Sequence, residues 1–258
     1  MSLENIGNEV YIRMNQAIIK KAVSGKREGI FHVSDLLEPK CLRNVFYSKT
    51  DPSPRMDMST AKNFYCGNIV HDNSDLSSVE GFHEFNMAYN PVTDKSVDLQ
   101  KALKEHPDQK DKFWYDVVIG TLDDLIMING EYVIADKKTK LSKPETVLFG
   151  KQFDGIKPEH RSQLSMYRLM LNRTRNIDAK FGCIMSLDYA DKFSNPKPQP
   201  FELEKIEVTR NKMLERLNVL KQSLITNDLP ERTIIPWMCN EYCPYASLCF
   251  NGDGVKFA

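Results

Sequence analysis

The sequence predicts an α/β fold from three consecutive features: a hairpin, a helix and a strand. Asn129-Gly130 separates two apolar runs rich in strand-forming residues. This pattern is typical of a two-residue hairpin turn, whose central residues need positive φ. A helical pattern follows at 159–173, with Pro158 suited to its first position, and 179–187 then reads as a strand. We expect the crossover that joins these elements to be right-handed.

Bulk composition indicates a globular protein with no overall attraction to nucleic acid. The chain has 258 residues, 41% of them hydrophobic, enough for one large domain with a small appended lobe. Its 35 basic and 35 acidic residues cancel, so any affinity for phosphate must be local. No apolar run approaches the roughly 18 residues that span a bilayer, and the amino terminus lacks a secretory pattern. We expect a cytoplasmic protein that does not enter the membrane.

The remaining elements follow from periodicity, capping and turn residues. Ser34 is suited to capping a short turn, and Ser59 or Thr60 a helix that runs toward His71. Further helices are expected at 4–23, 41–47 and 212–227, and strands at 82–89, 114–119 and 201–208. The charged segment 94–112 reads as an exposed insertion, and the prolines at 196, 198 and 200 as a loop.

The turn at Asn129-Gly130 also fixes the register of the hairpin. If Ile128 faces Glu131, each step back along one strand matches a step forward along the other. Asp123 then lies opposite Asp136. Opposed residues share a face of the sheet, as do residues two apart on one strand, so Lys138 projects the same way.

Two carboxylates opposed in an apolar hairpin repel each other, and this repulsion calls for a cation. A divalent metal on oxygen ligands, with Lys138 beside it, would relieve the repulsion and make a site for phosphodiester hydrolysis. Asp124 and Lys137 point to the other side, although a slipped register would make Asp124 the ligand. The alternative is a solvent-facing hairpin end with ordinary surface charges.

Cysteines form the second unusual feature. The chain contains Cys41, Cys66, Cys183, Cys239, Cys243 and Cys249. Three of them fall within eleven residues near the carboxy terminus, which in a reducing compartment favours metal over disulfides. Their spacing does not match a common zinc ribbon, and three thiolates leave a tetrahedral or cubane site one ligand short. The alternative is a group of buried, inert thiols.

Two further features have an ordinary and a functional interpretation. Gln163 and Tyr167 are four residues apart and share one face of an otherwise apolar helix, which by itself reads as a core helix with two polar positions. His71 is either a metal ligand or a hydrogen-bonded structural histidine.

Taken together, these motifs resemble the RecB-type branch of the PD-(D/E)XK nucleases, specifically its iron-sulfur members. The shared motifs are Gly120-x-x-Asp123, Asp136-x-Lys138-Thr139, Gln163-x-x-x-Tyr167, the upstream His71, and Cys41 with Cys239, Cys243 and Cys249. The CRISPR-associated RecB-like exonucleases are the most similar group, and the resemblance runs from Ser34 to Cys249. Related domains occur in bacterial recombination helicase-nucleases and in the eukaryotic replication helicase-nuclease. One departure is Asp136, where many members have the longer Glu.

The resemblance implies a restriction-endonuclease-like core, a central mixed sheet flanked by helices, within one nuclease domain at 1–258. The core would occupy 61–204. An iron-sulfur lobe would be built from the two end segments, 1–60 and 205–258.

The resemblance also implies roles for individual residues. His71, Asp123 and Asp136 would ligate Mg²⁺ or Mn²⁺, with the carbonyl of Lys137 as a further ligand. Lys138 would orient or activate the attacking water. Gln163 and Tyr167 would hold the site and the DNA strand. Independently of the resemblance, the zero net charge predicts that the DNA path is a local groove, with Arg43, Lys137, Lys140, Arg161 and Arg168 as phosphate contacts.

The same resemblance assigns a structural 4Fe-4S cluster to Cys41, Cys239, Cys243 and Cys249, tying the two ends of the chain together. Cys66 and Cys183 have no place in the motif and read as core residues. Zinc in place of iron-sulfur is the alternative occupant.

The expected function is therefore a metal-dependent DNA exonuclease acting on single-stranded ends, in CRISPR adaptation, antiviral defence, DNA repair or recombination. The alternative from a different class is a cluster-bearing DNA-binding adaptor that delivers ends to a partner such as a CRISPR integrase or a helicase. The intact set of Asp123, Asp136 and Lys138 favours the enzyme.

Overall fold

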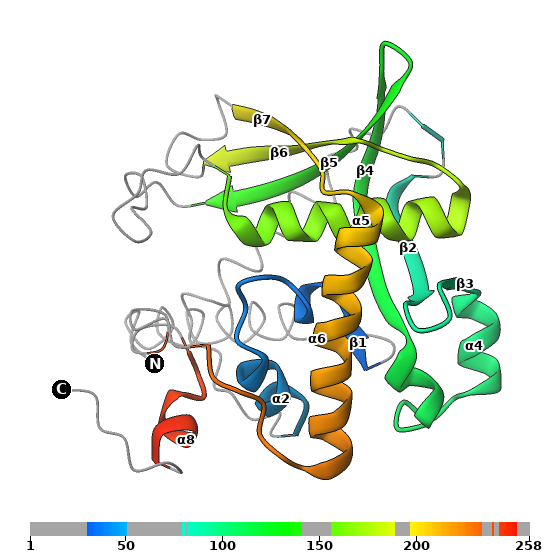
Figure 1. Cartoon of the computed structure of the whole chain (residues 1–258). Helices are drawn as coiled ribbons and strands as arrows, with labels where there is room; N and C mark the ends of the chain where they lie inside the picture. Colours follow the sequence, from blue (N-terminus) through cyan, green and yellow to red (C-terminus); the bar gives the residue numbers. More distant parts are fainter. Residues whose placement is uncertain are drawn as a thin grey trace, which may run out of the picture.

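A mixed sheet flanked by helices forms the centre of the molecule in the computed structural model (Figure 1). The structure describes residues 30–50, 79–80, 82–140, 156–188, 197–233, 239 and 243–251. Within these ranges the sheet has seven strands in the order β3-β2-β4-β5-β6-β7, and β1 pairs in parallel with β4. The expected α/β class, a central mixed sheet with flanking helices, is confirmed.

The bounds of the elements are as follows. The strands are β1 (Phe31–His32), β2 (His83–Asn90), β3 (Lys95–Val97), β4 (Val118–Ile128), β5 (Glu131–Lys140), β6 (Phe181–Asp188) and β7 (Lys197–Glu202). The α-helices are α2 (Leu42–Thr50), α4 (Leu99–Glu105), α5 (Pro158–Arg175), α6 (Ile206–Thr226) and α8 (Ala246–Asn251). Two short 3₁₀ helices are η1 (Val33–Asp35) and η2 (Lys112–Asp116).

The β4–β5 hairpin has the predicted turn and the predicted register. Asn129 and Gly130 take φ values of 52° and 84°, as the two-residue turn requires. The paired residues run from Ile128↔Glu131 to Asp124↔Ala135.

Beyond Asp124↔Ala135 the two strands separate. β4 continues beside β1 and β2, whereas β5 continues in parallel beside β6. Figure 1 shows the two strands leaving the hairpin in different directions. Asp123 and Asp136 therefore lie just past the last pair, at a fork, rather than opposed within a continuous ladder as we expected.

Helix α5 connects β5 to β6 and begins with Pro158 at its first turn, as predicted. Its buried face carries leucines and methionines that pack into the main core together with residues of β4, α2 and α6. Gly120 on β4 permits this close approach, since a Cβ there would lie 2.9 Å from the ring of Tyr167 and 2.9 Å from Val33.

The charged segment 94–112 is more ordered than an exposed insertion. It contains β3 and α4, whose first turn is capped by Asp98 accepting from the Lys101 N–H at 3.0 Å. Ala102 of α4 packs on Trp114, which is fully buried and donates from Nε1 to the His106 carbonyl at 3.0 Å. Trp114 lies in η2, so the predicted strand at 114–119 is wrong in its first half and β4 begins at Val118.

The proline-rich segment is also a strand rather than a loop. β7 contains Pro198 and Pro200 and pairs with β6 alone, at the edge of the sheet. Proline is tolerated there because an edge strand needs ladder hydrogen bonds on one side only. The strand predicted at 201–208 instead ends at Glu202, and α6 begins at Ile206, six residues before the predicted helix start.

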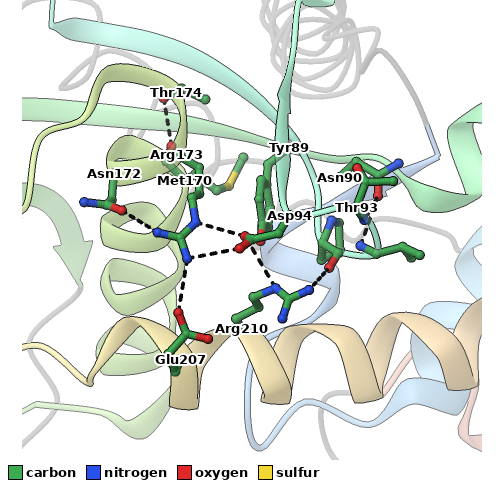
Figure 2. Close-up of polar contacts among 12 residues, drawn as sticks. Tyr89, Asn90, Thr93, Asp94, Met170, Asn172, Arg173, Thr174, Glu207 and Arg210 are labelled. Atoms are coloured by element: carbon green, nitrogen blue, oxygen red, sulfur yellow. Dashed lines mark hydrogen bonds and ion pairs between the residues drawn. The ribbon is translucent and has the colours of Figure 1, made fainter.

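A polar cluster ties the β2–β3 turn to α5 and α6 (Figure 2). Asp94 accepts from the buried Tyr89 hydroxyl at 2.6 Å and from Arg173 at 2.9 and 3.1 Å. Arg210 of α6 lies 3.4 Å from the same carboxylate, and Glu207 pairs with Arg173 at 3.1 Å. Arg173, which donates to Asp94, holds the pKa of that carboxyl below its usual range.

Helices from both ends of the described chain pack together. Tyr47 of α2 stacks on Tyr245, just before α8, with ring centroids 5.6 Å apart, and α2 also contacts α6. None of the helices in the ranges given above is long and apolar enough to cross a membrane. The helix predicted at 4–23, the helix toward His71, and Cys66 lie outside the described residues.

Candidate active site

The fork between β4 and β5 brings three sequence-predicted residues together: Asp123, Asp136 and Lys138, which we call the fork trio. The Asp123 carboxylate accepts from the Lys137 backbone N–H at 2.9 Å, at the point where the ladder has ended. The Asp123 carboxylate thereby takes the place of the backbone carbonyl that would accept this hydrogen bond if the two strands were still paired. Asp123 is 7% exposed and Asp136 1% exposed, so both carboxylates are buried.

Lys138 is the most solvent-exposed member of the fork trio. Its Nζ lies 3.0 Å from Oδ1 and 2.8 Å from Oδ2 of Asp136, and its side chain is 30% exposed. The trio brings two carboxylate side chains and one ammonium group to the fork. Buried carboxylates are stabilised by a nearby cation or by hydrogen-bond donors.

A second group lies on the opposite face of the sheet. It consists of His83, Asp124 and Lys137, and we call it the inner trio. Lys137 Nζ lies 3.1 Å from Asp124 Oδ2, and His83 Nδ1 lies 2.8 Å from Asp124 Oδ1. Asp124 and Lys137 are 0% and 1% exposed. The pair balances its own charge, as buried ions must.

The inner trio corrects one expectation about Lys137 and supports another about Asp124. The Lys137 side chain is buried against Asp124, so it is not a phosphate contact; its backbone N–H donates to Asp123 at the fork. The register did not slip, so Asp124 faces away from Asp123, as alternation along a strand requires.

Helix α5 presents the predicted Gln163–Tyr167 pair to the same part of the sheet. Gln163 Nε2 donates to the Tyr167 hydroxyl at 2.9 Å. Tyr167 is 6% exposed and packs over Gly120, three residues before Asp123. The glycine in the Gly120-x-x-Asp123 motif is thus explained by the ring that covers it.

His160 is a site neighbour that sequence reasoning missed. Burial, followed by the positive charges of Lys138 and Lys157, lowers the pKa of His160 to about 3. The histidine is therefore neutral at physiological pH. Its position could have been found from helical spacing, since His160, Gln163 and Tyr167 follow the i, i+3, i+7 pattern of one face.

The side chains that we expected to contact phosphate lie in different environments. Arg168 is 11% exposed and binds Asp178 at 2.7 and 3.1 Å as well as the carbonyls of Leu203 and Glu204, which is a structural role. Arg161 lies 4.8 Å over the Phe201 ring. The Lys140 side chain is outside the described part of the structure.

A metal would find oxygen ligands at the fork. Asp123, Asp136 and the Lys137 carbonyl are of the type that Mg²⁺ and Mn²⁺ prefer. Among the residues that the structure describes, no group of three His, Cys, Asp or Glu side chains is already arranged to hold a metal ion. His71, the predicted fourth ligand, lies outside those residues.

Three of the four predicted cluster cysteines lie where α2 meets the α8 segment. Cys41 directly precedes α2, whereas Cys243 and Cys249 precede and lie within α8. Asn44 Nδ2 donates to Cys243 Sγ at 3.3 Å, and Arg43 Nη1 to Cys249 Sγ at 3.9 Å. Cys239 is a free thiol, as are these three.

The electrostatics connect Cys41 to the same place. Burial raises the pKa of the Cys249 thiol, which Arg43 and Arg232 lower and Cys41 raises further. Burial also lowers the pKa of Arg216 on α6, which interacts with Cys41 and Glu38. Cys183 is elsewhere, on β6 opposite Pro200, and is only partly buried.

Comparison with known proteins shows a likeness of fold and no more. No family model matches the chain, and no curated protein matches it. Among solved structures, the crystal structure of the protein SSO0001 resembles it with a TM-score of 0.53 and 18% sequence identity. The match covers 93% of this chain and 96% of SSO0001, so the likeness extends over nearly the whole fold.

Proposed function

We propose that this protein is a metal-dependent DNA nuclease with a restriction-endonuclease-like core, acting as an exonuclease on single-stranded ends. The observation that carries the proposal is the fork trio: two buried carboxylates beside a partly exposed lysine, where β4 and β5 separate. The inner trio, one residue away on each strand, has its lysine buried against Asp124, whereas the lysine of the fork trio is 30% exposed.

Each member of the site has a chemical task in this proposal. Asp123, Asp136, the Lys137 carbonyl and His71 would hold Mg²⁺ or Mn²⁺, which when bound lowers the pKa of a water molecule and polarises the phosphate. Lys138, which is 30% exposed, can leave Asp136 to orient that water and offset charge on the phosphate. Gln163 and Tyr167, which are hydrogen-bonded to each other on α5, would hold the site and the DNA strand.

The second part of the proposal is a structural 4Fe-4S cluster on Cys41, Cys239, Cys243 and Cys249. Thiolates are the usual ligands of such clusters. One observation at this place concerns Arg216, which interacts with Glu38 and with Cys41 and has a buried Nε with no hydrogen-bond partner in the described part of the chain. A cluster carried by four thiolates would supply an acceptor near Cys41. The substrate ends would come from CRISPR adaptation, repair or recombination, with an integrase or helicase as partner.

Degradation of end-labelled single-stranded DNA tests the nuclease. Protein purified without oxygen is incubated with Mn²⁺ or Mg²⁺, and the wild type is compared with Lys138→Ala. The expected loss is about 100-fold or more, as when a group that stabilises transition-state charge is removed. Lys101→Ala is the matched control, because Lys101 is 69% exposed on α4 and its side chain pairs with Glu105 of the same helix.

Two results would contradict the proposal. Cleavage that survives unchanged in Lys138→Ala would place the activity elsewhere. Absence of cleavage in the wild type, with metal and cluster both present, would favour an adaptor that binds DNA ends and delivers them to a partner.

A further inference from the structure

The first turn of α2 places two hydrogen-bond donors on the sulfurs of the carboxy-terminal cysteines. Asn44 donates to Cys243 at 3.3 Å, and Arg43 donates to Cys249 at 3.9 Å. These contacts join residues 199 and 206 positions apart in the chain. Cys41 lies only two and three residues before the two donors, so one short segment supplies both a thiol and the groups that bond to two others.

Each donor is held in place by the surrounding structure. Arg43 also donates from Nε to the carbonyl of Pro230, in the segment that follows α6, at 2.8 Å. Asn44 lies one turn before Tyr47 and Ser48, and Tyr47 stacks on Tyr245 between Cys243 and Cys249. The donors are therefore oriented by α2, and the sulfurs are oriented by the stacking of Tyr245 on the same helix.

We propose that Arg43 and Asn44 are positioning residues of the iron-sulfur site, whose hydrogen bonds to Cys249 and Cys243 raise the reduction potential of the cluster. This inference rests on the proposed 4Fe-4S cluster. In addition to the ligand Cys41 that precedes it, α2 would then supply the two donors that raise the reduction potential.

The physical reason is the charge that the cluster gains on reduction. One electron from a reductant converts the oxidised cluster to a form with one more negative charge, with no bond made or broken. N–H donors aimed at the ligand sulfurs stabilise that added charge, so they favour the reduced form. A cationic donor has a stronger effect than a neutral one, because charge-assisted hydrogen bonds are the stronger class. Arg43 has the greater charge, whereas Asn44 has the shorter contact.

A reductive titration followed by electron paramagnetic resonance tests the inference. Protein isolated without oxygen is titrated with dithionite, and the midpoint potential is compared among the wild type, Asn44→Ala and Arg43→Ala. We expect both variants to shift to a more negative midpoint. Ser48→Ala is the matched control on the same helix, because the Ser48 hydroxyl donates to the Val45 carbonyl rather than to a sulfur.

The possible outcomes separate this inference from the proposed cluster. An unchanged midpoint in both variants, with iron content equal to that of the wild type, would overturn the inference and leave the cluster standing. A wild-type protein without iron or sulfide would overturn both. If Arg43→Ala loses its iron, Arg43→Lys takes its place in the comparison, because lysine keeps a cationic donor. A midpoint potential of Arg43→Lys that lies between those of the wild type and Asn44→Ala would support the inference. A midpoint for Arg43→Lys equal to that of the wild type, together with an unshifted Asn44→Ala, would refute it.

Discussion

The two faces of the β4–β5 hairpin carry similar charged residues, but the burial and pairing of these residues differ. On one side Asp124 is enclosed by Lys137 and His83, and both members of the ion pair are 1% exposed or less. On the other side Asp123 accepts from the Lys137 backbone N–H, and Asp136 pairs with Lys138, which is 30% exposed. The comparison separates a fully buried ion pair from one whose lysine is partly exposed to solvent.

Strand pairing explains why the two sides differ. The inner trio lies at the end of the paired region, where His83↔Asp124 and Asp124↔Ala135 join β2, β4 and β5. The fork trio begins one residue further, where β4 and β5 no longer pair. There the Asp123 carboxylate accepts the Lys137 N–H in place of a backbone carbonyl. Separation of the strands thus leaves the Lys137 N–H to the Asp123 carboxylate.

The largest expected effect is on the inner trio. Lys137→Met should lower the free energy of unfolding by about 3–5 kcal/mol, because it leaves Asp124 buried without its cation. Urea denaturation measures the change. The double variant Asp124→Asn with Lys137→Met should recover part of the loss. A single variant that loses less than about 1 kcal/mol would mean that the pair is not buried as described.

The second-largest effect is expected at the fork trio, where DNA cleavage rather than the stability of the fold should fall. Asp136→Asn should reduce DNA cleavage by about 100-fold, roughly 3 kcal/mol in the barrier. It should leave the free energy of unfolding unchanged or slightly raised, because it relieves repulsion between buried carboxylates. Cleavage assays and urea denaturation on the same preparation check both parts. Strong destabilisation would show that Asp136 acts as Asp124 does.

The Asp94 cluster, which is balanced but partly exposed, sharpens the comparison through pH. Asp94→Asn should cost about 1–2 kcal/mol at pH 7. The pKa of Asp94 is lowered in the folded protein, mainly by its hydrogen bond from Arg173, so the unfolded chain binds more protons as acid is added. The stabilisation is therefore complete above pH 4 to 5 and is lost as the pH falls below about 4.

Denaturation of wild type and Asp94→Asn across this pH range measures the difference between them. The two curves should converge at acid pH. A difference that stays constant from pH 7 to pH 3 would contradict an electrostatic role for Asp94.

The smallest expected effect is at the edge of the inner trio. His83→Ala should cost about 1 kcal/mol, because Asp124 keeps Lys137 as its partner and the histidine is 30% exposed. Thermal unfolding should show a shift smaller than that of Lys137→Met. A larger shift would make His83, rather than Lys137, the main partner of Asp124.

The sequence was sufficient for the hairpin and for the faces on which its charged residues lie. Asn129-Gly130 determines a turn locally, and the register follows from it, so the positions of Asp124 and Lys137 could be derived by counting. The helix that carries Gln163 and Tyr167 could be derived from its periodicity and from Pro158.

The fork itself could not be derived in this way. It depends on β4 pairing with β1 and β2 while β5 pairs with β6, and such pairings between distant segments leave no local pattern. The same holds for the contacts of Arg43 and Asn44 with the distant cysteines. β7 was missed for another reason: its prolines read as a loop, and only its place at the edge of the sheet makes them acceptable.

Stabilisation by Mn²⁺ tests the central claim that the fork, and not the opposite side of the hairpin, is built for a cation. The melting temperature is measured with and without Mn²⁺ for wild type, Asp136→Asn and Asp124→Asn. A ligand at 100 times its dissociation constant stabilises by about 2.7 kcal/mol, which thermal melting resolves. We predict that Mn²⁺ raises the melting temperature of the wild type and of Asp124→Asn, which itself melts lower, but not that of Asp136→Asn. An equal Mn²⁺ shift in Asp136→Asn would contradict the account.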